Sequence, residues 1–245
     1  MEPEYYCEDP TSVPFKVMLR FLSRQVPYPM AIGIAALFRI RGKLRLPFQA
    51  NYGAADASYA RVVSERDIPP YVAAKWAPHI EQLKDLGFTS VCVRLPKLIG
   101  AKEQVLALYL SQDRCVISTL EWQRLAGANG PVEEVTLEMN SYGDEDPEVF
   151  TGMTKPENLA LVDMFKLDFV DLYMMSNEHP IRLLYDKHYE RVARRRMFQF
   201  SADAAAAEHL ARSRRRFEAM RASGLLRALS KKEIPRVMAK SLPPL

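Results

Sequence analysis

The chain has 245 residues, of which 48% are hydrophobic and 26% are charged, and its net charge is +4. These values exclude a disordered or collagen-like chain and allow a sizeable hydrophobic core. Three cysteines are too few for a disulfide framework, and the chain lacks an uncharged apolar run of the roughly 18 residues that cross a membrane. We therefore expect a cytoplasmic protein, which could also attach peripherally to a membrane.

Charged residues are segregated along the chain. Residues 1–13 contain four acids and no base, whereas residues 14–48 contain seven bases and no acid. Residues 49–186 contain 12 bases and 21 acids, and residues 187–245 contain 15 bases and five acids. An acidic middle thus separates two basic segments, and both segments suit contact with an anionic surface or partner.

The first basic segment is predicted to begin with an amphipathic helix. Apolar residues recur there at helical spacing: Phe15, Met18, Leu19, Leu22 and Val26. Pro27 and Pro29 end this helix, and the nearly continuous apolar run 30–38 fits either a second short helix or a buried strand. We treat residues 1–48, an acidic leader and a basic amphipathic segment, as one unit and residues 49–77 as a connector.

Residues 78–198 are predicted to form the main domain. A helix over residues 78–86 ends at Gly87, and the hydrophobic period then changes from 3.6 to 2. Strands are predicted at residues 88–95, 104–111, 115–122, 132–140 and 148–153. Their short connections leave no room for crossover helices, so we expect an α+β fold in which one antiparallel five-stranded meander sheet is packed by helices.

The pattern within one strand predicts how the sheet is covered. Val135, Leu137 and Met139 alternate with polar residues, which indicates one face under helices and one face in water. Beyond the strands, residues 157–175 fit a helix better than an edge strand, and a helix from Pro180 to about residue 195 follows. Residues 199–245 are predicted to be an arginine-rich helical tail with a long helix over residues 202–222.

Motifs for catalysis or nucleotide binding are missing from the sequence. We find no glycine-rich phosphate loop, G-x-S-x-G elbow or H-E-x-x-H pair, and we assign no catalytic residue, cofactor or metal. The most suggestive neighbourhood for a general base contains His179, Tyr185 and His188. Asp186 and His188 would point to different faces of a helix, so we place His188 on the helix surface.

Two groups of side chains are predicted to make external contacts. The cations that would meet an anionic surface or partner are Lys16, Arg20, Arg24, Arg39, Arg41, Lys43, Arg45, Arg212, Arg214, Arg215 and Arg216. The accompanying apolar interface consists of Met18, Leu19 and Leu22. A second interpretation stays open, in which the first segment is ordinary core and its basic flank faces the acidic middle of the chain.

These patterns lead to the hypothesis of a non-enzymatic interaction or structural protein, either a subunit of a larger assembly or a peripheral membrane-associated protein. A protein complex or an anionic membrane surface is the expected partner. One alternative is a nucleic-acid-binding protein, because arginine clusters also bind phosphates, although no RNP-like, helix-turn-helix or zinc-finger pattern supports it. The other alternative is an enzyme with a site around His179 and His188.

Overall fold

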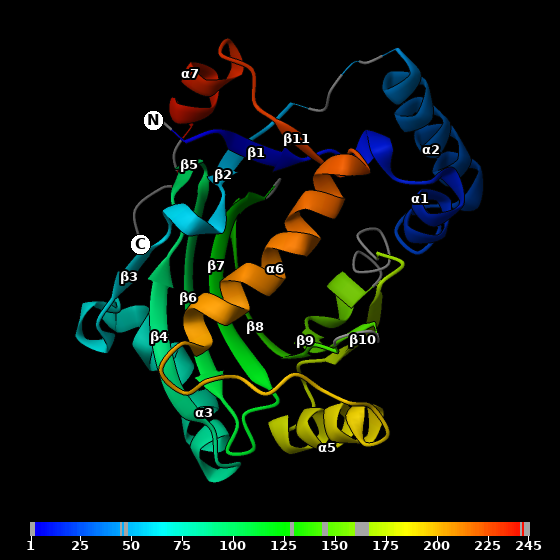
Figure 1. Cartoon of the computed structure of the whole chain (residues 1–245). Helices are drawn as coiled ribbons and strands as arrows, with labels where there is room; N and C mark the ends of the chain where they lie inside the picture. The colour runs from blue at the N-terminus through cyan, green and yellow to red at the C-terminus, as the bar shows by residue number, and fades with distance from the viewer. Residues whose placement is uncertain are drawn as a thin grey trace.

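The computed structural model describes residues 3–44, 46, 49–127, 130–143, 147–159, 167–240 and 242. Within them the chain forms an α+β fold with two β-sheets and six α-helices (Figure 1). The helices are α1 (Phe15–Leu22), α2 (Tyr28–Lys43), α3 (Pro70–Asp85), α5 (Ile181–Val192), α6 (Ala205–Ala222) and α7 (Glu233–Met238).

The larger sheet has seven strands in the order β10-β9-β8-β7-β6-β4-β3. They are β3 (Arg61–Val63), β4 (Thr89–Leu95), β6 (Lys102–Leu110), β7 (Ile117–Gly127), β8 (Gly130–Ser141), β9 (Glu148–Thr154) and β10 (Val170–Ser176). The expectation of a single five-stranded antiparallel sheet is therefore wrong. Five strands occupy the predicted runs, but β3 and β10 extend the sheet at both edges and a second sheet is present.

The helix predicted over residues 157–175 is wrong for the end of that range, where the structure has strand β10. Residues 160–166 lie outside the described part of the chain. β10 pairs with β9 in parallel, with Val170 opposite Glu148 and Ser176 opposite Thr154. A parallel connection needs about a dozen residues or more, and the segment 155–169 between the two strands supplies them. Pairing with a long neighbouring strand outweighs the helical spacing on which the prediction rested.

The smaller sheet contains four short antiparallel strands in the order β11-β1-β2-β5. These are β1 (Tyr5–Glu8), β2 (Tyr52–Ala55), β5 (Leu98–Gly100) and β11 (Leu226–Ala228). Each has only three or four residues, and its partners come from distant parts of the chain. Such strands carry little periodicity, which is why the sequence did not predict this sheet.

Helices cover both faces of the larger sheet. On one face α3 and α5 pack over the main core, which contains the fully buried side chains of Trp76, Leu83, Leu120 and Leu184. On the opposite face α6 crosses the sheet diagonally (Figure 1), and the Arg94 guanidinium on β4 donates a 2.7 Å hydrogen bond to a carbonyl of this helix. The expectation that this second face lies in water is therefore wrong.

Helices α1 and α2 form a hairpin at one edge of the molecule, remote from α3 (Figure 1). The hairpin is inserted between β1 and β2, which pair with each other. Its inner side shares a cluster with Val13 and with Leu225, which lies between α6 and β11. The body therefore holds the hairpin by one side and leaves the other side open to solvent.

Candidate functional site

The apolar side chains of α1 form the interior of the hairpin. Met18 is buried, and Leu19 and Leu22 are half-buried in the cluster that includes Ala35 and Phe38 of α2. The spacing of Ala31, Ala35 and Phe38 puts these small and aromatic residues on the side of α2 that faces α1. The predicted apolar interface thus contributes to packing between the two helices.

A second apolar stripe lies on the outer side of α2. Met30, Leu37, Ile40 and Leu44 are between 53% and 63% exposed and recur at the helical spacing that keeps side chains on one face. Gly33 lies on the same face, and a Cβ built there would meet no atom within 4 Å. Helix α2 is therefore apolar on both its inner and outer sides, although only the inner side is covered.

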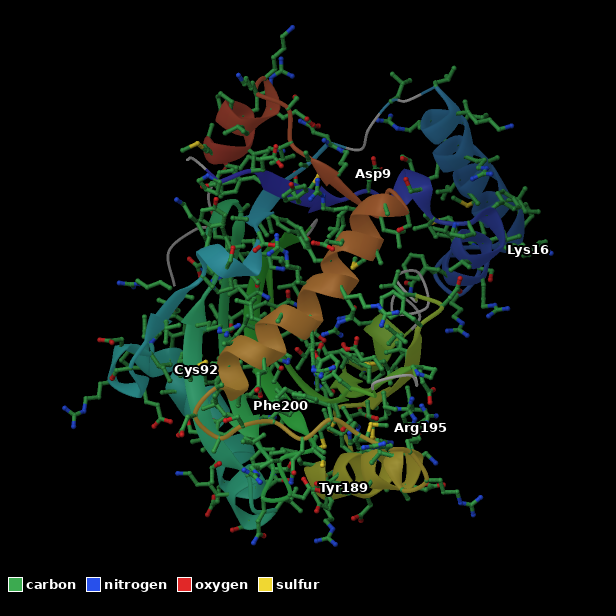
Figure 2. The ribbon with its side chains drawn as sticks, viewed as in Figure 1. Asp9, Lys16, Cys92, Tyr189, Arg195 and Phe200 are labelled. Atoms are coloured by element: carbon green, nitrogen blue, oxygen red, sulfur yellow. The ribbon has the colours of Figure 1, made fainter. Side chains whose placement is uncertain are left out.

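Basic side chains accompany this exposed stripe. Lys16, Arg20 and Arg24 are exposed and follow one another at intervals of four residues; Lys16 lies at the outer edge of the molecule (Figure 2). Arg39 and Lys43 are exposed on α2, whereas Arg41 is half-buried. Arg45 lies outside the described residues. The hairpin therefore carries both uncovered apolar side chains and exposed cations, and its own sequence contributes no acid.

The arginines predicted at the carboxy-terminal end of the chain have partners within the body. Arg212 lies over the Phe198 ring at 3.5 Å, and Arg215 lies over the Phe169 ring at 4.5 Å. Arg214 forms an ion pair with Glu218, and Arg216 forms one with Glu148, each with an Nε–Oε1 distance of 3.2 Å. Helix α6 is accordingly part of the covering of the sheet, and Arg212, Arg215 and Arg216 hold it there, whereas the Arg214 pair lies within the helix.

Beneath α6 the sheet carries a row of polar side chains that we did not single out in the sequence. Strand register places Glu138 and Glu121 diagonally across β8 and β7 on this face. Desolvation raises the pKa of Glu138 to about 8, the charge of Glu121 acts in the same direction, and Arg216 opposes it. Asn140, two residues further along β8, is fully buried, and its amide makes no hydrogen bond with the described residues.

One histidine belongs to this covered face. His209 on α6 is buried, and its Nδ1 lies 3.1 Å from the Tyr142 hydroxyl. Burial lowers the pKa of His209 to about 3, so the ring is neutral at physiological pH. Among the residues that the structure describes, no group of three or more His, Cys, Asp or Glu side chains is arranged to hold a metal ion.

The expectation that His188 lies on a helix surface is wrong. Its ring is fully buried between α5 and the sheet, with Nε2 2.9 Å from the Ser141 hydroxyl and Nδ1 2.9 Å from the Thr151 hydroxyl. Because Ser141 donates its own hydrogen to the Cys115 carbonyl, Nε2 must be the protonated nitrogen. His179 is exposed and takes no part in this network. The two histidines therefore do not form the catalytic neighbourhood that we considered.

Comparison of the chain with models of protein families, with characterised proteins and with solved structures gives no match. In the part of the chain that the structure describes, no helix is both long enough and apolar enough to cross a membrane. Inference about function therefore depends on the surface of the hairpin and on the chemistry around it.

Proposed function

We propose that this protein is a non-enzymatic interaction protein that attaches to an anionic membrane surface through the α1–α2 hairpin. The observation that supports the proposal is the exposed stripe Met30, Leu37, Ile40 and Leu44, on a hairpin that also carries exposed cations and no acid. A helix with apolar side chains on both its inner and outer sides is normally covered on both by protein or lipid. The 16 residues of α2 extend only about 24 Å, which suits a helix that lies in the interface plane.

The expected binding energy has two parts. Fully burying an aliphatic side chain contributes about 1.5–3 kcal/mol, so each of the four half-exposed residues can contribute about 1 kcal/mol when it enters the headgroup boundary. Each cation near an anionic surface contributes about 1 kcal/mol more. Apolar insertion and charge attraction together are enough for stable attachment. The attachment is reversible, because neither contribution requires the chain to cross the bilayer.

Charge is the reason to favour an anionic lipid surface over a second copy of this chain. The stripe spacing would also suit packing of two helices, but two such hairpins would bring cations together with no acid of the segment 14–48 to compensate. Binding to nucleic acid would use the cations but would leave the apolar stripe exposed. An anionic bilayer satisfies both features of the surface.

The test is cosedimentation of the full chain with vesicles of phosphatidylcholine alone or mixed with phosphatidylserine. The variant Leu37→Ser/Ile40→Ser is expected to weaken binding at least tenfold at every salt concentration. Its matched control is Val62→Ser/Leu183→Ser, which removes two exposed apolar side chains elsewhere and should bind as wild type does. Circular dichroism establishes that the variants remain folded.

A second pair of variants tests the contribution of charge. Lys16→Gln/Arg20→Gln is expected to lose about tenfold in affinity at low ionic strength and much less at 0.5 M salt, because salt screens exposed charges. The control Lys231→Gln/Lys232→Gln removes two exposed cations near α7 and should have little effect. If wild type does not bind anionic vesicles, or is a dimer that the α2 variant makes monomeric, the proposed function is wrong.

A further inference from the structure

A cleft of about 660 Å³ lies where the hairpin joins the body. Its walls come from the last turn of α2, from the 3₁₀-helix η1 (Pro10–Ser12), from the end of α6, and from β11 with the start of α7. Asp9 lies at this junction, near the end of α6 (Figure 2). The volume falls within the range of about 300–1,000 Å³ that small-molecule sites occupy.

Two glycines shape this junction. A Cβ on Gly42 would lie 2.7 Å from the carbonyl oxygen of Thr11, so only glycine allows α2 to approach η1 this closely. Gly224, which follows α6, has a φ of +77°, and a Cβ there would lie 2.8 Å from the Ser12 hydroxyl. Close packing at these two glycines therefore fixes the position of two walls of the cleft.

The acids in the cleft already have partners. Arg227 forms two hydrogen bonds with the Glu233 carboxylate, at 2.7 and 3.0 Å, and its Nε lies 3.5 Å from Asp9. Asp9 also accepts hydrogen bonds from the amide and the hydroxyl of Thr11. Hydrogen bonds from Arg227 and from the amide and hydroxyl of Ser230 hold the pKa of Glu233 down to about 2, so this carboxylate stays charged and paired at neutral pH.

The two cations at the α2 wall differ from Arg227 in this respect. Arg39 and Lys43 line the cleft from successive turns of α2, and neither forms an ion pair or hydrogen bond with the residues that the structure describes. Both side chains are exposed, so they can turn toward a bound group without breaking an existing contact. The cleft thus offers two available positive charges beside two carboxylates that share the Arg227 guanidinium.

We propose that this cleft binds a phosphomonoester carried by the headgroup of a membrane lipid, with Arg39 and Lys43 as its ligands. The inference rests on the proposed function and deepens it, because the same end of α2 would lie at the bilayer surface. A phosphomonoester carries about −1.5 to −2 charges at neutral pH, which matches two cations, whereas the phosphodiester of an ordinary headgroup carries one. Arg39 can bind two phosphate oxygens at once, and Lys43 supplies a point charge.

The test compares two kinds of vesicle of equal surface potential, one containing phosphatidylserine and the other phosphatidylinositol 4-phosphate. Wild type is expected to bind the second at least tenfold more tightly. Arg39→Gln/Lys43→Gln should abolish this preference. Lys16→Gln/Arg20→Gln makes the same change in charge on the same hairpin, and it should weaken binding to both kinds of vesicle but keep the preference for the second. Ala228→Phe narrows the cleft without changing charge and should remove the preference alone.

A soluble probe separates a lipid headgroup from a free phosphate. Inositol 1,4-bisphosphate, followed by calorimetry, should bind wild type and compete with phosphatidylinositol 4-phosphate vesicles. Equal affinity of wild type for the two vesicles, with no binding of the probe, overturns the cleft proposal and leaves attachment of the hairpin intact. Binding of the probe without binding of any vesicle overturns the lipid source and the proposed function, and supports a site for soluble phosphomonoesters.

Discussion

Replacement of Glu138 by glutamine is expected to stabilise the protein at neutral and alkaline pH. In the folded state the pKa of this carboxyl is raised from 4.5 to about 8, first by desolvation and then by the charge of Glu121. The folded protein consequently holds a proton on Glu138 that the unfolded chain releases above pH 4.5. Stability is unaffected below pH 4.5 and falls as the pH rises from 4.5 to 8.

The magnitude follows from the width of this window. Each pH unit costs about 1.4 kcal/mol, so at pH 7 the cost approaches about 3 kcal/mol, and we expect about 2 kcal/mol because the side chain retains some accessible surface. Glu138→Gln keeps the size of the side chain and removes its ionisation. The variant should therefore exceed wild type in free energy of unfolding by about 2 kcal/mol at pH 7 and match it near pH 4.5.

Urea unfolding at half-unit steps from pH 4.5 to 8 measures this difference directly. Glu178→Gln serves as the control, because its side chain is exposed in the turn before α5 and should change stability by less than about 0.5 kcal/mol. Parallel stability curves for wild type and Glu138→Gln would refute the reasoning, since they would show that the carboxyl is not protonated in the folded state.

Two further changes test the packing of α5 and α6. His188→Ala should lower the free energy of unfolding by about 2–4 kcal/mol at pH 7, because it leaves a cavity and removes the hydrogen-bond partner of the Ser141 and Thr151 hydroxyls. Burial lowers the pKa of His188 to about 3, so the wild type loses stability as the pH falls below 6.5. Chemical denaturation should therefore show a smaller difference between the variant and the wild type at pH 5 than at pH 7. Arg216→Met should cost about 3 kcal/mol by leaving buried Glu148 unpaired. The double mutant Arg216→Met/Glu148→Gln should recover much of that loss, because it removes the unpaired buried charge. A double-mutant cycle on the exposed Arg214–Glu218 pair should give a coupling energy under about 0.5 kcal/mol. A negligible coupling energy between Arg216 and Glu148 would contradict their assignment as a buried ion pair.

The sequence predicted those parts of the fold whose periodicity is local. The alternation of Val135, Leu137 and Met139 correctly indicated a strand with one side in the core. The polar side of that strand could not be assigned from its own residues, because its covering helix, α6, lies about 70 residues later and brings the charge of Arg216 to Glu138. An α+β fold with antiparallel regions was predictable, whereas the second sheet depended on pairing between distant short strands.

Burial of His188 was within reach of the sequence. The apolar residues Ile181, Leu184 and Val192 recur at helical spacing, and His188 falls on the same face, so the periodicity of α5 already placed the ring toward the core. The outer stripe of α2 was harder to foresee, since the run 30–38 is apolar in every direction and sequence alone does not say which side a neighbour covers. Only packing against α1 separates the inner residues from the exposed ones.

The insertion of the hairpin between β1 and β2 has a mechanical consequence. A hairpin held at a surface is tethered to the body by two strands that lie side by side, with β1 also bonded to β11 and β2 also bonded to β5. Tension on the tether is therefore divided between neighbouring strands and passed to the whole four-stranded sheet. Separating the hairpin from the body by force would require the pairing of both strands to break. The small sheet therefore resists such a force better than any one of its short strands would alone.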